Sequence, residues 1–192
     1  MLTFEIKHQE QYSRGELLLR SFFGWLYILI PHYILLMFYS LWQAILSVFA
    51  WFVILFTGNT PDWYYQTTLK TMRWSTRISA RLMNLSDGYP SFGPNGTDEA
   101  TNVDFPLVHI GRLNLIIRTL FGVLMAIPHL FCLYFRLIAA MFVMFIAWWI
   151  VLFTGKYPAG MHSFVVGTFR WGMRVGIYLN FLSESYPPFS GK

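Results

Sequence analysis

Two long stretches of the chain are almost free of charged residues. Between Arg20 and Asp62 there is no Asp, Glu, Lys or Arg, and between Arg118 and Lys156 there is only Arg136. Each stretch is about twice the roughly 20 apolar residues that cross a hydrocarbon core. The pattern therefore predicts an all-α integral membrane protein with two spans in each stretch, four transmembrane helices in all.

The two stretches belong to an internal repeat. The segment "WFVILFTGNTP" from Trp51 matches "WWIVLFTGKYP" from Trp148 at an offset of 97 residues, which also pairs His32 with His129. Upstream the offset becomes 98, so one residue has been gained or lost in the first span. Such dense matches indicate two structural units that pack against each other. The expected bounds are 1–90 for the first unit, 91–102 for a Gly- and Pro-rich linker, and 103–192 for the second unit.

Each unit is expected to contain a short strand, a two-span hairpin and a third helix. The strands are expected at "TFEIKH" and "TNVDFPL", which alternate apolar and polar residues. Pro31 lies too close to Arg20 for a turn at "PH", because about 16 Å of helix would end inside the membrane. A turn near Tyr39–Gln43, and near Arg136–Ala140 in the second unit, keeps Arg136 at an interface. The expected spans are about 17–38, 41–57, 113–135 and 137–154.

The third helices, expected at about 62–85 and 160–182, are basic and amphipathic. Cations at spacings of three and four share one face beside an apolar stripe. This pattern is typical of helices in the membrane interface, with arginines directed to lipid phosphates. The candidate lipid-binding residues are Lys70, Arg73, Arg77, Arg81, Arg170 and Arg174. A second face carries Ser75, Ser79, Gly172 and Gly176, small residues that predict close helix packing.

The side of the membrane follows from the positive charges. Two-span hairpins place nearly all lysines and arginines on one side, which the positive-inside rule makes cytoplasmic, together with both termini. The units would then be parallel repeats. If the third helices instead crossed the membrane, the units would be inverted and much positive charge would lie outside.

Composition narrows the class of partner and cofactor. The content of 56% hydrophobic and only 12% charged residues excludes the class of ordinary soluble domains. The net charge of +5, carried by the interfacial helices, favours anionic lipid over nucleic acid. The single Cys132 rules out an intramolecular disulfide and a cysteine-based metal site.

His32 and His129, each after a proline within a span, are the candidate intramembrane polar residues. One interpretation is structural, with neutral rings hydrogen-bonded near the kink. The other is functional, with both rings lining a shared cavity, relaying protons or binding haem. The spans contain no carboxylate to serve a proton relay.

The second unit contains four distinctive motifs: "AIPHL" at 126–130, "AWWIVLFTGKYPAG" at 147–160, "FRWGMRVGIYL" at 169–179 and "YPPF" at 186–189. Together they resemble a bacterial membrane-domain family known only as a domain of unknown function. The first unit is a looser copy, with "FTGNTP" and "YPSF". The resemblance implies a location in the bacterial inner membrane and supplies no catalytic residues.

The expected function is that of a non-enzymatic accessory or assembly subunit of a larger membrane complex, or of a homo-oligomer, that binds anionic lipid. One alternative is a small transporter or channel for lipid or another apolar solute. Another is a haem-binding membrane subunit. No catalytic constellation of residues is evident in the sequence.

Overall fold

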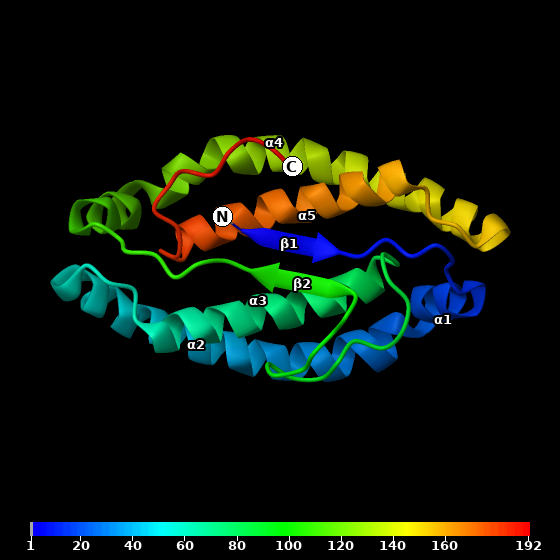
Figure 1. The fold of residues 1–192 in the computed structure, drawn as a ribbon, viewed down its shortest axis with the longest axis horizontal. Helices are drawn as coiled ribbons and strands as arrows, with labels where there is room; N and C mark the ends of the chain where they lie inside the picture. The colour runs from blue at the N-terminus through cyan, green and yellow to red at the C-terminus, as the bar shows by residue number, and fades with distance from the viewer. Residues whose placement is uncertain (1) are drawn as a thin grey trace.

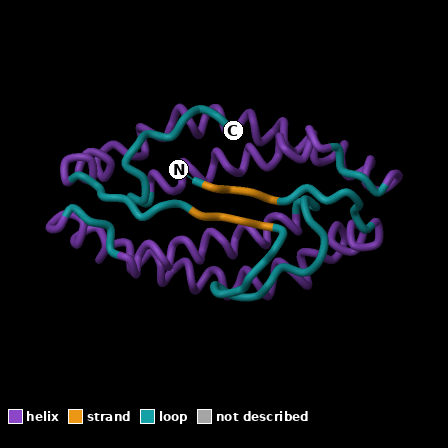
Figure 2. Tube along the Cα trace, in the orientation of Figure 1, coloured by secondary structure: helices purple, strands orange, loops and turns teal. Residues whose placement is uncertain are grey.

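The computed structural model describes residues 2–192 and is mostly helical, with one small antiparallel sheet (Figure 1). Each repeat has a short strand, a long helix and a shorter helix that folds back along the long one (Figure 2). The first repeat contains β1 (Thr3–Ile6), α1 (Arg14–Gly24), a π-helical turn η1 (Trp25–Leu29), α2 (Ile30–Thr57) and α3 (Asp62–Leu82). The second contains β2 (Thr101–Asp104), α4 (Arg112–Thr154) and α5 (Ala159–Leu179).

The predicted turns inside the apolar stretches are wrong. α1, η1 and α2 run without interruption as one helix of 44 residues, and α4 is a single helix of 43 residues. We call these the first and second long helices. The stretch around Tyr39–Gln43 contains no glycine or proline to end a helix. Arg136 needs no membrane interface, because its Nε donates to Thr168 Oγ1 at 3.0 Å and its guanidinium lies 4.6 Å from the Phe164 ring centre.

The change of offset between the repeats has a structural counterpart in the first long helix. The first repeat has one residue more than the second in the segment before its proline, and η1 lies in that segment. A π-helical turn accommodates an extra residue without ending the helix. Gly24 and its counterpart Gly122 precede the inserted residue along the chain. They lie beside Leu82 and Leu179, which also match each other across the repeat.

The two long helices are antiparallel to each other and meet at both ends (Figure 1). The Tyr12 N–H donates to Gly155 O at 2.8 Å, and the Ile110 N–H donates to Gly58 O at 3.2 Å. Each helix also receives an arginine from the start of the other: Arg14 donates to Phe153 O, and Arg112 to Phe56 O. A cation on the last carbonyls of a helix is favourable because it opposes the helix dipole.

The sheet exchanges one strand between the repeats. The expected strands are confirmed as β1 and β2, which pair with each other in the register Phe4↔Val103. β1 packs on α5 of the second repeat, whereas β2 packs on α3 of the first. The inward side chains of Phe4, Ile6 and Val103 are buried in the main core, and the outward side chains, including Glu5 and Asp104, are exposed.

The ends of the long helices have a local cause in the sequence. Gly58 and Gly155 have φ of 75° and 72°, the left-handed conformation that suits a glycine after the last helical residue. Pro61 and Pro158 immediately precede α3 and α5. The loops between long and short helices are therefore fixed by local sequence.

We expect Gly155→Ala to destabilise the protein by about 1–2 kcal/mol, because a Cβ at positive φ is strained. The matched control is Gly160→Ala, since a Cβ there meets nothing within 4 Å and the residue is helical. That change should be neutral or slightly stabilising. Denaturant unfolding of both variants in the same detergent checks the pair, and equal effects would contradict the assignment of strain to Gly155.

Candidate functional site

His32 is completely buried and is held between two side chains of its own repeat. Trp74 Nε1 donates to His32 Nδ1 at 3.0 Å, and His32 Nε2 lies 3.0 Å from Tyr89 Oη. Because an indole N–H only donates, Nδ1 must be the acceptor, so a neutral ring carries its proton on Nε2. Nε2–H then donates to Tyr89, whose hydroxyl lies 3.3 Å from Tyr27 O.

His129 occupies the equivalent position in the second repeat, with one difference. Trp171 Nε1 donates to His129 Nδ1 at 3.0 Å, and Tyr186 donates to Met125 O at 2.8 Å. The ring of Phe189 stacks on the imidazole with 3.9 Å between centres. Nε2 of His129 has no hydrogen-bond partner among the described residues. His129 is thus covered by aromatic rings, but only one of its two ring nitrogens is hydrogen-bonded.

These contacts join three separate motifs into one unit. The histidine comes from a long helix, the tryptophan from α3 or α5, and the tyrosine and phenylalanine from the end of the repeat. Each histidine is enclosed by its own repeat, so the two rings do not face a common cavity. Within residues 2–192, no group of three His, Cys, Asp or Glu side chains is placed to hold a metal ion.

Most of the candidate lipid-binding arginines point into the protein. Arg77 donates to Ser91 O and Gly93 O. Arg174 donates to Ser190 O and Lys192 O, and Arg170 donates to Phe4 O and Gly191 O. The α3 and α5 arginines therefore fasten loops and strands to the helices. Lys70 is half-buried and Arg73 is exposed, which leaves these two side chains nearest to solvent.

Arg81 forms a buried ion pair with Asp98. Both of its Nη atoms donate to Asp98, at 2.5 and 2.9 Å, and the two side chains are only 6% and 8% exposed. Burial alone raises the pKa of Asp98. Hydrogen bonds from Arg81, the Ala100 N–H and Thr101, with the charge of Arg81, outweigh burial and hold that pKa below its ordinary value.

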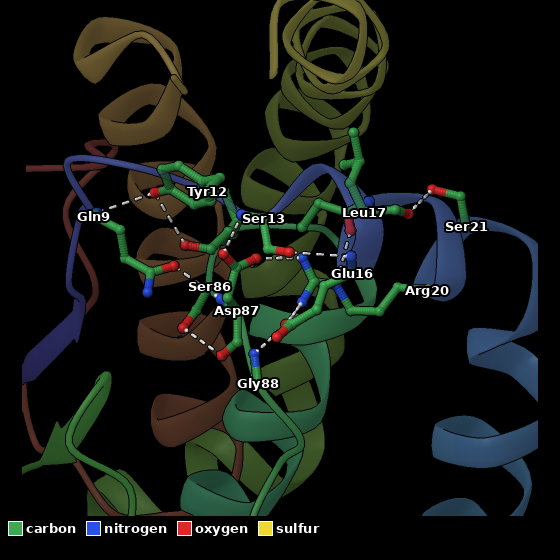
Figure 3. Close-up of polar contacts among 12 residues, drawn as sticks. Gln9, Tyr12, Ser13, Glu16, Leu17, Arg20, Ser21, Ser86, Asp87 and Gly88 are labelled. Carbon is green, nitrogen blue, oxygen red and sulfur yellow. Dashed lines mark hydrogen bonds and ion pairs between the residues drawn. The ribbon is translucent and has the colours of Figure 1, made fainter. Parts of the chain in front are cut away.

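Arg20 anchors a second network that the sequence analysis did not single out (Figure 3). Its guanidinium donates to Glu16 at 2.8 Å, to Asp87 at 2.7 Å and to Asn84 at 3.0 Å. Asp87 also accepts from the Ser13 N–H at 2.6 Å. The network ties the start of the first long helix to the segment after α3.

Arg118 is the counterpart of Arg20 but lacks a carboxylate partner within 4 Å among the described residues. Asn114 stands where the first repeat has Glu16, and Glu184 stands where it has Asp87. Arg118 donates to Asn114, Tyr178 O and Ser183 O, and lies 4.4 Å from the Tyr178 ring centre. Its Nη2 has no hydrogen-bond partner among residues 2–192. The match of Arg20 to Arg118 at an offset of 98 residues is the sequence signal from which both networks could have been found.

A further buried cluster lies where the first long helix meets the end of the second. His162 is buried, with Nε2 3.3 Å from Leu85 O, and its ring is 5.0 Å from that of His8. Burial lowers the pKa of His162, which favours the neutral ring. This contact was not predicted from the sequence, because His8 and Leu85 lie far from His162 along the chain.

The small residues of α3 and α5 line one groove but do not bring the helices into close contact. A groove of about 390 Å³ is lined by Ser75, Ser79, Gly172 and Gly176, with Phe4 and Leu133 among its other walls. A Cβ on Gly172 or Gly176 would meet no other atom of the described residues within 4 Å. The expected close approach of helix backbones is therefore not present at these glycines.

A family model described as a domain of unknown function, DUF4389, matches the chain twice, over residues 18–93 and 112–191. The chain belongs to the DUF4389 family. The tandem duplication is thus confirmed. Each DUF4389 match contains one histidine with its tryptophan and tyrosine neighbours, and most or all of one long helix with the shorter helix that folds back along it. No curated protein and no solved structure matches the chain.

Trp171→Phe should destabilise the second DUF4389 unit by about 1–3 kcal/mol, because His129 Nδ1 loses its donor in a buried site. In the His129→Leu background, Trp171→Phe should destabilise the protein less than it does in the wild type, because the Nδ1 acceptor is already absent. Unfolding of the single and double variants measures this coupling. Trp149→Phe, on the exposed face of α4, is the control and should change little. Additive effects at Trp171 and His129 would contradict the hydrogen bond.

Asp98→Asn should cost about 3–5 kcal/mol, because it leaves the Arg81 guanidinium buried without its anion. The matched control is Asp104→Asn, since the Arg73–Asp104 pair is 43% and 58% exposed and should contribute at most about 1 kcal/mol. Denaturant unfolding at neutral pH compares the two. Equal losses would contradict a special role for the buried pair.

The same pair predicts an acid dependence of stability. Since the pKa of Asp98 is lower in the folded chain than its ordinary 3.8, its contribution is fully present above that value. The contribution is lost as the pH falls through the folded pKa. The unfolding free energy of the wild type should therefore decline below about pH 4 more steeply than that of Asp98→Asn.

Proposed function

We propose that the protein is a non-enzymatic, membrane-anchored accessory or assembly subunit, attached through the outer faces of its two long helices. The observation that carries this proposal is the exposure of large apolar side chains along both helices. They recur on successive turns from Leu18 to Phe56 and from Leu113 to Phe153. Exposed apolar surface on this scale is typical of contact with lipid or another protein.

The interior supports a structural role rather than chemistry. The buried histidines and most of the arginines are bonded to backbone carbonyls or to neighbouring side chains that hold the repeats together. In this proposal the location is the bacterial inner membrane. The charged sheet and loops face the cytoplasm. There Lys70 is available to anionic headgroups, whereas Arg73 is exposed but also bonded to Val103 O and Asp104.

The anchoring is tested by placing charge on the outer face of α4. Leu120→Asp with Val123→Asp alters side chains that are 68% and 74% exposed, so the fold should persist. Each Asp in hydrocarbon costs about 2.5–3.5 kcal/mol, and the variant should move from the alkali-washed membrane pellet to the soluble fraction. The control, Thr3→Asp with Asn102→Asp, adds the same charge on the exposed sheet face and should stay in the pellet. A soluble wild type would refute the anchoring.

The accessory role is tested separately. Native mass spectrometry of the protein extracted in mild detergent should show a stoichiometric protein partner or a homo-oligomer. A single monodisperse monomer would count against the subunit role while leaving the anchoring intact.

A further inference from the structure

The apolar faces of the long helices are too long for one upright crossing of a bilayer. From Leu18 to Phe56 the exposed apolar side chains extend over about 57 Å of helix at 1.5 Å per residue. From Leu113 to Phe153 they extend over about 60 Å. The hydrocarbon core is about 30 Å thick. An upright helix would leave about half of this surface in water.

A strongly tilted crossing is disfavoured by the position of the sheet. β1 and β2 lie beside the middle of α3 and α5, as the contacts Arg73 to Val103 O and Arg170 to Phe4 O show (Figure 1). If the long helices crossed the bilayer, their middle parts, and the sheet with them, would lie at membrane depth. The exposed carboxylates of Glu5 and Asp104 would then enter hydrocarbon, where a charged side chain is costly.

The charged residues are distributed as expected for long helices that lie parallel to the membrane plane. Beyond their first residues, the long helices contain Glu16 and three arginines, Arg20, Arg118 and Arg136. Glu16 lies in the first turn and accepts from Arg20. Arg20 and Arg118 are buried, and Arg136 is half-buried against α5. The remaining charges lie on the strands, on α3 and α5, in the connecting segments and at the tips of the long helices.

We propose that the protein inserts into one leaflet only, with both long helices parallel to the membrane plane and the β1–β2 sheet facing the water. The occupant of the apolar face is the acyl-chain region of that leaflet. Helices with one lipid-facing side lie in the interface in this way, whatever their length. This inference rests on the proposed membrane anchoring and replaces the four predicted spans.

Single cysteines in a Cys132→Ser background test the arrangement. Glu10→Cys and Asp62→Cys mark the two ends of the first long helix, Glu5→Cys marks the sheet, and Ser40→Cys marks the middle of the apolar face; all four positions are exposed. A membrane-impermeant maleimide is applied to membrane vesicles of both orientations. The first three cysteines should react from the same side only. Cys at position 40 should react at least 10-fold faster after detergent is added.

Two labelling patterns would overturn the proposal. Reaction of the two helix ends from opposite sides would show a crossing helix, and reaction at position 40 from the far side would show a two-span hairpin. Failure of the anchoring itself would look different, because the protein would be absent from the membrane pellet.

Polarised infrared spectroscopy of the unmodified protein in oriented bilayers gives a second test. The amide I dichroism should indicate helices near the membrane plane, and dichroism of upright helices would overturn the inference.

Discussion

The pairing of one strand from each repeat is the interaction on which the rest of the structure depends. The Lys7 N–H donates to Ala100 O, so in this antiparallel ladder the carbonyls of Phe4 and Val103 point away from the partner strand. Arg170 and Arg73 donate to these two carbonyls. Each repeat therefore holds the strand of the other, and both outer edges of a ribbon that would be marginal alone are fastened to a helix.

The two repeats have the same order of helices and strands, but their buried arginines have different partners. In the first, Arg20 and Arg81 are paired with Asp87 and Asp98. In the second, Tyr178 stands in place of Arg81, and its ring lies beside Arg118. A cation near an aromatic ring and backbone carbonyls is stabilised without a carboxylate, though less completely. The second repeat thus carries more of the net positive charge in its interior.

Much of the architecture was predictable because it depends on local spacing. The two strands and the glycine-capped ends of the long helices follow from patterns within a few residues, and the repeat follows from direct comparison of the two halves of the sequence. The structural interpretation of His32 and His129 agrees with the hydrogen bonds from Trp74 and Trp171, but the donors themselves were not predicted. Those tryptophans are 42 residues away along the chain, and only the folding of α3 and α5 onto the long helices brings them near.

The sequence by itself determined that this protein is a duplicated, strongly apolar helical chain, because repetition and hydrophobicity are properties of the chain alone. Only the tertiary structure decided that each apolar stretch is one helix rather than two, because contacts with α5 cover Arg136 and remove the need for a turn. It also decided that Arg77 and Arg174 face inward. A helical pattern shows which residues share a face, whereas the direction of that face is set by segments that arrive from elsewhere in the chain.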